Sequence, residues 1–262
     1  WYPSNPRELE RELEGYLAKA EDFQLSGPVR LAICPHAGYA FSGATAAAIY
    51  KNLERRQYET VVVLAPSHRV PINGVAPWCS GSFETPIGDL EVDEDFCKRV
   101  FDSWEFSKPS AQAHRLEHSL EMQLPFIRYV LGDVKIVPLI IGAHSLQLAR
   151  ELAERLSGAI AAREDVLTVA STDLSHFHPA PQAERLDKRA ADLIRDGDGE
   201  KLYEAESSGE CELCGIMPVT TALFLSTSLL PDRKIDVLAY THSGRVIGDN
   251  SSVVGYLAAA IH

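Results

Sequence analysis

The chain lacks the features of membrane and secreted proteins. No apolar run approaches the roughly 18 to 20 residues that cross a bilayer. The first residues, WYPSNPRELERE, contain neither the basic nor the apolar region of a signal peptide. Basic residues are also few, because 25 Lys and Arg stand against 37 Asp and Glu, and they form no phosphate-binding cluster. We therefore expect a cytoplasmic protein that binds neither membranes nor nucleic acid.

The five cysteines are odd in number and widely scattered, at positions 34, 79, 97, 211 and 214. Without an export signal, this pattern predicts reduced thiols rather than a disulfide framework. Cys211 and Cys214 form a single C-E-L-C motif, which lacks the second pair of a structural zinc site. Cys214 has the better claim to function, because it precedes a predicted helix whose positive end would favour a thiolate.

Apolar strand-like runs alternate with helical segments along the whole chain. The predicted strands are 29–35, 60–66, 135–142, 166–171, 234–243 and 251–262. The predicted helices are 44–56, 93–104, 116–131, 145–162, 182–195, 199–207 and 218–230, after a first helix that Ser4 or Asn5 caps. The turn-rich segment 70–91 predicts a small antiparallel excursion. The alternation favours one α/β domain, residues 1–262, with a mixed, largely parallel sheet and helices on both faces.

Three of the apolar runs end in the same way, with a histidine just beyond the last apolar residue. These are His36, His68 and His176. Ligands of open α/β sheets bind beyond the carboxyl ends of the strands, so the three imidazoles are expected to converge on one site. Either His36 or His68 alone would be typical of a hydrogen-bonded structural residue. Two histidines at equivalent strand ends indicate a shared metal centre or acid/base site.

Two further pairs carry possible chemistry. Asp173 and His176 have an i,i+3 spacing that would let the carboxylate orient the imidazole or raise its pKa. In the alternative interpretation, Asp173 caps the next turn and His176 lies on the surface. His118 and Glu121 share one face of a predicted helix, which suits a ligand pair but is also common on solvated helices.

Several ordered motifs together resemble the Memo family, whose prokaryotic members are often called the B component of the AmmeMemoRadiSam system. They are YPSN (2–5), PHAGYAFSG (35–43), PSH (66–68), EHSLEMQLPF (117–126), STDLSH (171–176), CGIMP (214–218) and DNSSVVGYLA (249–258). The resemblance implies a fold like that of class III extradiol dioxygenases, non-haem iron enzymes that open catechol rings. It also implies metal ligands, which are His36, His68 and Cys214. Asp173, His176 and His118 would then face the site, with His176 as acid/base.

One feature departs from the ring-cleaving enzymes. Those enzymes hold Fe(II) with two histidines and a carboxylate, whereas here a cysteine would take the place of the carboxylate. A thiolate is a softer ligand and can itself be oxidised. The likeness to the ring-cleaving enzymes makes Fe(II) the first candidate for the implied metal, and the softer thiolate makes copper and zinc the alternatives.

Three functional hypotheses follow. The first is an iron-dependent dioxygenase for a small, catechol-like aromatic substrate, with His176, oriented by Asp173, moving the substrate proton. The second is a zinc hydrolase that uses the same two histidines and cysteine, with His176 as general base. The third is a non-enzymatic adaptor that binds a peptide or a metal, because animal relatives are described as adaptors for phosphotyrosine-containing receptor tails. The lack of an arginine cluster near the motifs weakens the phosphotyrosine version.

Overall fold

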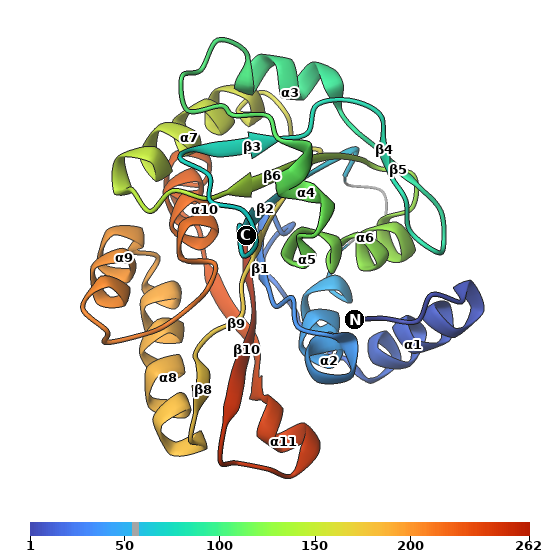
Figure 1. Ribbon diagram of the computed structural model, residues 1–262, viewed down its shortest axis with the longest axis vertical. Helices are drawn as coiled ribbons and strands as arrows, with labels where there is room; N and C mark the ends of the chain where they lie inside the picture. The colour runs from blue at the N-terminus through green and yellow to red at the C-terminus, as the bar shows by residue number, and fades with distance from the viewer. Residues whose placement is uncertain (54–57) are drawn as a thin grey trace.

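A mixed sheet forms the centre of the computed structural model, which describes residues 1–53 and 58–262. Four parallel strands lie side by side in the order β6 (Lys135–Ile141), β2 (Thr60–Pro66), β7 (Val166–Ser171) and β1 (Leu31–Cys34). Antiparallel strands extend both edges: β3 (Val75–Pro77) pairs with β6, and β10 (Val253–Ile261) pairs with β1. Two more strands, β8 (His176–His178) and β9 (Ile235–His242), pair with β10. The predicted mixed, largely parallel sheet is confirmed (Figure 1).

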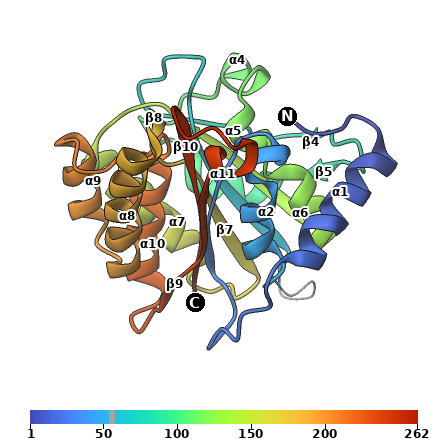
Figure 2. The same ribbon diagram turned by 90° about the horizontal axis from the view of Figure 1, so that it is seen from below.

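Helices cover both faces of this sheet, as Figure 2 shows. One face carries α7 (Leu146–Ile160), α8 (Ala180–Asp196), α9 (Gly199–Ser207) and α10 (Ile216–Leu229). The other face carries α1 (Pro6–Lys19), α2 (Tyr39–Tyr50), α6 (Leu124–Leu131) and α11 (Ser243–Ile247). Every residue of β2 and β7 is therefore buried, which explains why these strands read as unbroken apolar runs rather than as an alternating pattern.

The first helix illustrates how local sequence sets an element. The side chain of Asn5 accepts hydrogen bonds from the backbone N–H groups of Arg7 and Glu8, and Pro6 occupies the first helical position. Asn5 rather than Ser4 is thus the capping residue. One turn apart, the fully buried Leu9 and Leu13 lie on the same face of α1 and pack it into the core.

Several predicted helices and strands have different limits in the structure. The predicted helix 116–131 is two helices, α5 (His118–Glu121) and α6, because Pro125 in the first turn of α6 cannot continue the hydrogen bonds of a preceding turn. The predicted helix 44–56 begins earlier, at Tyr39, and its last predicted residues lie outside the described residues. Two short helices, α4 (Ala111–Arg115) and α11, were not predicted, since five residues are too few for a periodic signal.

The segment 70–91 is only partly the antiparallel excursion that its turn residues predict. Strands β4 (Ser82–Phe83) and β5 (Leu90–Glu91) do form a separate two-stranded antiparallel sheet. β3, however, joins the main sheet at its β6 edge. Helix α3 (Glu94–Phe101) follows and packs against α7 and β6.

No helix in the described part of the chain combines the length and the apolar character that crossing a membrane requires. The cytoplasmic location inferred from the sequence stays a prediction.

The packing of β10 against α8 supports a test of stability. A Cβ on Gly255 would lie 2.1 Å from Oδ2 of Asp187. That buried carboxylate accepts hydrogen bonds from the Ser175 N–H, at 2.9 Å, and from the Tyr240 hydroxyl, at 2.7 Å. Gly255→Ala should therefore overpack the site and displace both bonds, lowering the free energy of unfolding by about 2 to 4 kcal/mol.

Urea unfolding measures this effect, with Gly158→Ala as the matched control. Nothing lies within 4 Å of a Cβ built on Gly158, which is in α7. The added methyl should raise the free energy of unfolding by about 0.5 to 1 kcal/mol, because alanine loses less backbone entropy in a helix. Similar effects of the two substitutions would contradict the packing argument.

Candidate metal centre

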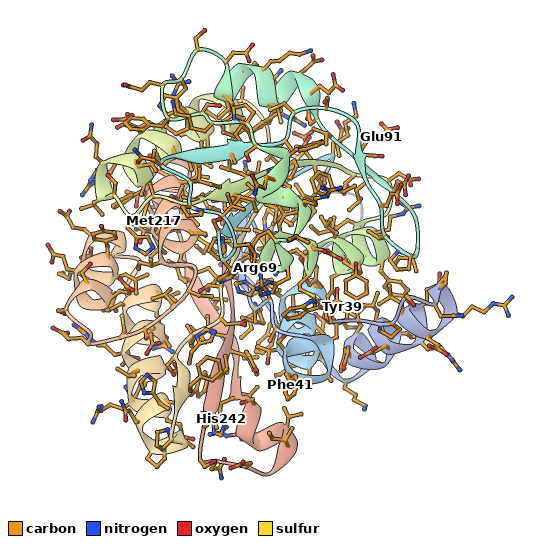
Figure 3. The ribbon with its side chains drawn as sticks, in the orientation of Figure 1. Tyr39, Phe41, Arg69, Glu91, Met217 and His242 are labelled. Carbon is orange, nitrogen blue, oxygen red and sulfur yellow. The ribbon has the colours of Figure 1, made fainter. Side chains whose placement is uncertain are left out.

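The candidate site lies where the parallel strands end. His36 is two residues beyond β1, His68 two residues beyond β2, and Asp173 two residues beyond β7. The carboxyl ends of parallel strands meet at one edge of a sheet, so these equivalent positions come together despite their separation in sequence. Figure 3 labels Arg69, the exposed neighbour of His68, beside a group of nitrogen atoms near the middle of the view.

His36, His68 and Cys214 form a group of possible metal ligands. Each offers one ligand atom, and the three atoms lie within 4.8 Å of one another. Nε2 of His36 is 3.2 Å from Sγ of Cys214, a residue 178 positions further along the chain. The structure thus brings together the three residues that the Memo resemblance implied as ligands.

Close backbone packing between the end of β7 and the start of α10 fixes the position of Cys214. A Cβ on Gly215 would lie 2.3 Å from the carbonyl oxygen of Ser171 and 2.5 Å from Cβ of Thr172, so only glycine fits. The Gly215 N–H donates to Oγ1 of Thr172, at 2.9 Å, and the Cys214 N–H donates to the carbonyl of Asp173, at 3.2 Å. These contacts hold the cysteine beside the strand end.

The hydrogen bonds around Ser171 set the tautomer of His36. The Ser171 hydroxyl donates its proton to the carbonyl of Ser119, at 2.6 Å, and accepts from Nε2 of Gln123, at 2.9 Å. Nδ1 of His36, 2.9 Å from the same hydroxyl oxygen, must then be the protonated ring nitrogen. Nε2 keeps its lone pair and points toward Cys214, as a metal-binding imidazole requires.

Glu117 has the same effect on His68. Its carboxylate accepts from Nδ1 of His68, at 2.8 Å, from the His68 N–H, at 2.5 Å, and from the Ser119 N–H, at 3.1 Å. Burial alone would raise the pKa of Glu117, but these hydrogen bonds outweigh it and lower the pKa to about 2. Since a carboxylate only accepts, Nδ1 of His68 carries the proton and Nε2 is free to bind a cation.

The environment of Cys214 fits a metal ion. Burial raises the pKa of this thiol well above its usual range, and the carboxylate of Asp173 raises it further. A neighbouring cation would stabilise a thiolate at this position, because burial and the nearby carboxylate both oppose its charge. Two oriented imidazole nitrogens beside such a sulfur make a donor set for a soft or borderline divalent metal.

Asp173 does not orient His176, contrary to the interpretation of their spacing. Its Oδ1 accepts from the N–H groups of His36, at 2.8 Å, and Ala37, at 3.3 Å. Among the described residues, no hydrogen bond joins Asp173 to His176. The i,i+3 argument holds for helical turns, whereas residues 172–175 form an irregular connection between β7 and β8. Burial raises the pKa of Asp173 to about 7, although the two backbone donors oppose that shift.

The His118 ring centroid lies 5.4 Å from that of His36, and His176 is near enough to His36 and His68 to interact with them electrostatically. Burial lowers the pKa of His176, and burial together with the neighbouring His68 lowers the pKa of His118 to about 4. Both imidazoles are therefore neutral at pH 7. The His118 ring stacks between Trp1, at a centroid distance of 4.3 Å, and His68, at 4.9 Å. Its predicted partner Glu121 instead accepts a hydrogen bond from the Tyr2 hydroxyl, at 2.9 Å, so these two residues are not a ligand pair.

Sequence reasoning missed Glu117, Ser171 and Gln123 as site residues. Glu117 and Ser171 hydrogen-bond to Nδ1 of His68 and of His36, and Gln123 hydrogen-bonds to Ser171. Glu117 directly precedes α5, and Gln123 directly precedes α6. Glu117 had one available signal, since an acidic residue directly ahead of a helix suits an N-cap, which its bond to the Ser119 N–H confirms. The hydrogen bond to His68 has no such local signal.

An open, largely parallel α/β sheet with nitrogen and sulfur donors at its strand ends defines an α/β protein with a possible metal site. The family model described as Memo-like protein matches residues 1–260, and the chain belongs to the Memo family. A MEMO1 family protein of Methanopyrus kandleri is 35% identical over 272 residues, covering 98% of this chain and 94% of the relative. One from Desulfurococcus amylolyticus is 33% identical over 270 residues, with the same coverage.

A solved structure supports the fold. The crystal structure of an uncharacterized protein from Escherichia coli K12 matches with a TM-score of 0.55, covering 89% of this chain and 100% of that chain. At 12% sequence identity the likeness concerns the fold alone. The family resemblance stated from the motifs is confirmed by the family model and the relatives.

The orientation of His68 by Glu117 predicts a measurable effect on metal binding. Glu117→Gln keeps the size of the side chain but replaces the carboxylate that fixes the imidazole. Zn(II) affinity should fall by about 10- to 100-fold, as is usual when such an orienting carboxylate is lost. Competition with a chromophoric chelator measures it. Glu121→Gln, on the same short helix, should leave the affinity unchanged, and equal losses in both variants would refute the assigned role.

Proposed function

We propose that this Memo protein is a non-haem, iron(II)-dependent dioxygenase of the extradiol type, acting on a small catechol-like substrate. The observation that carries the proposal is the convergence of His36, His68 and Cys214 at the strand ends, with their ligand atoms within 4.8 Å of one another. The Memo resemblance implies a fold like that of ring-cleaving dioxygenases. This likeness favours oxidation as the reaction. Two neutral histidines beside the site provide groups for proton transfer.

His36, His68 and Cys214 would hold the ion, and Ser171 and Glu117 would keep the two imidazoles in the binding tautomer. Bound Fe(II) would supply the capacity to activate dioxygen and a phenolic substrate. Three protein ligands leave further coordination positions open, as in other iron oxygenases.

Other side chains around the site suit a planar aromatic substrate. The His118 ring is stacked between Trp1 and His68, so the flat aromatic surface next to the site is the outer face of the exposed Trp1 ring. Arg69 is exposed and close enough to influence His118 electrostatically. Its guanidinium would favour a catechol that carries an acidic group. His176 would take the proton from a substrate hydroxyl and return it to the opened ring.

The proposal is tested by anaerobic loading with Fe(II), followed by exposure to dioxygen with a panel of catechols. The panel should include matched compounds with and without a carboxylate. Coloured ring-opened products that contain both atoms of labelled dioxygen are expected, without any added reductant. Stoichiometric bound iron with no turnover across the panel would contradict the proposal.

The two cysteines of the C-E-L-C motif provide a matched pair of variants. Cys214→Ala removes a ligand and should reduce Fe(II) affinity by at least about 100-fold, with loss of turnover. Cys211→Ala removes a thiol that is outside the ligand group and should retain both properties. Cys214→Asp restores the two-histidine, one-carboxylate set of other iron enzymes and should recover iron binding. Equal iron content in the wild type and Cys214→Ala would exclude the cysteine as a ligand.

A pH profile tests the role of His176. A base must be neutral, and burial lowers the pKa of His176 below its usual 6.5, so the acidic limb of kcat/KM should lie below pH 6.5. His176→Gln should remove this limb and slow the reaction by about 10²- to 10⁴-fold. His178→Gln should leave the profile unchanged, because its ring pairs with Glu212 at 2.6 Å. An unchanged limb in His176→Gln would assign the base elsewhere.

Zinc-dependent hydrolysis is a second candidate, because two histidines and a cysteine also form a known catalytic zinc set. In that case His176 would act as general base toward water. Metal analysis of protein purified without added metal separates the two candidates. Stoichiometric zinc, with ester or amide hydrolysis and no oxygen uptake, would favour the hydrolase.

A further inference from the structure

Two cysteines outside the candidate metal centre lie close together in the fold, although the cysteines are scattered along the sequence. Cys79 is in the loop between β3 and β4, and Cys97 is on α3. The fold brings the two residues close together, so that each thiol shifts the pKa of the other. Sγ of Cys97 also lies 3.7 Å from the carbonyl oxygen of Trp78, in the peptide bond that leads into Cys79. Both cysteines are free thiols.

The loop around Cys79 is fixed against its surroundings. The Trp78 N–H donates to the carbonyl of Pro138 on β6, at 3.1 Å. The Gly81 N–H donates to Oε1 of Glu94 in the first turn of α3, at 3.3 Å, and the Gly81 carbonyl accepts from the Val92 N–H, at 2.9 Å. The position of Cys79 next to Cys97 is thus fixed by contacts on both sides of the loop.

The two thiols differ in a way that suits sequential oxidation. Cys79 is half-buried, whereas Cys97 is fully buried. The neighbouring Cys97 thiol lowers the pKa of Cys79, against the opposing effects of burial, Asp102 and Glu94. The neighbouring Cys79 and burial raise the pKa of Cys97. Cys79 is therefore the thiol that an oxidant reaches first, and Cys97 is placed to react with the oxidised product.

We propose that Cys79 and Cys97 are a redox-sensitive pair that closes to an intramolecular disulfide when a hydroperoxide oxidises the protein. The Cys79 thiolate attacks the peroxide, the O–O bond breaks, and with hydrogen peroxide the products are a sulfenic acid and water. The sulfur of Cys97 then attacks the sulfenic sulfur, an S–S bond forms, the S–O bond breaks, and a second water leaves with the Cys97 proton. In sum, two thiols lose two electrons and two protons, and one peroxide becomes two waters.

The disulfide would join the loop before β4 to α3 and close residues 80–96 into a covalent ring. This ring contains the β4–β5 sheet, whose Phe83 contacts His114 with a ring-centroid distance of 5.9 Å. His114 is on α4, which leads directly into the segment that carries Glu117 and His118. Oxidation would thereby stiffen a region that contacts α4, without using any of the proposed metal ligands.

Peptide mapping of the full chain after treatment with hydrogen peroxide tests the proposal. The expected product is a reducible cross-link between the peptides that contain Cys79 and Cys97. The melting temperature should rise by about 5 to 10 °C on oxidation and return on reduction, because closing a loop of this length restricts the unfolded chain.

Variants separate this pair from the other thiols. Cys79→Ser and Cys97→Ala should each abolish the cross-link and the shift, while Cys211→Ser should keep both. Cys79→Ser changes a half-buried side chain, so it remains informative if the core variant Cys97→Ala fails to fold. It should also leave Zn(II) binding at the metal centre intact, so this inference stands or falls separately from the proposed function. Oxidation of Cys79 to a sulfinic acid with Cys97 still reduced would overturn the proposal, as would a cross-link to a different cysteine.

Discussion

The arrangement of the candidate metal centre depends on the hydrogen bonds of one short segment, residues 171–173 at the end of β7. Ser171 sets the tautomer of His36, and the carboxylate of Asp173 binds the backbone of His36 and Ala37. The Asp173 N–H donates to Sγ of Cys214, at 3.3 Å, while its carbonyl accepts from the Cys214 N–H. Because one buried strand end contacts both a nitrogen and a sulfur donor, small shifts in β7 would move the two ligands together. The rigid central sheet thus holds the possible ligands in a fixed arrangement.

Much of the fold could be predicted from the sequence, for reasons that the structure makes visible. The strand over 166–171 has the predicted limits, because a sheet covered on both faces demands an unbroken apolar run. The helix over 199–207 also has its predicted limits, since Asp198 caps it and its side chain accepts from the Lys201 N–H. The convergence of His36 and His68 followed from their equivalent places after parallel strands.

What the sequence could not show depends on contacts between distant segments. No local pattern connects Cys214 with His36, and the ligand group was complete only through the resemblance to the Memo family. The residues that hydrogen-bond to the imidazoles, such as Glu117, belong to other segments. No local sequence pattern predicts how those segments pack against the strand ends. The expected pairing of Asp173 with His176 was wrong because a helical spacing rule was applied to an irregular connection. The proximity of Cys79 and Cys97 could not be predicted either, because no local pattern links the two positions.

The wide separation of His36, His68 and Cys214 along the chain would make folding depend on the concentration of any ion that all three bind. An unfolded chain cannot hold three donors together, so any cation that binds all three binds the native state alone. At a free concentration 100-fold above its dissociation constant, such an ion would stabilise the native protein by about 2.7 kcal/mol. The cellular supply of the metal would then govern how long the folded protein survives, independently of any reaction that it catalyses.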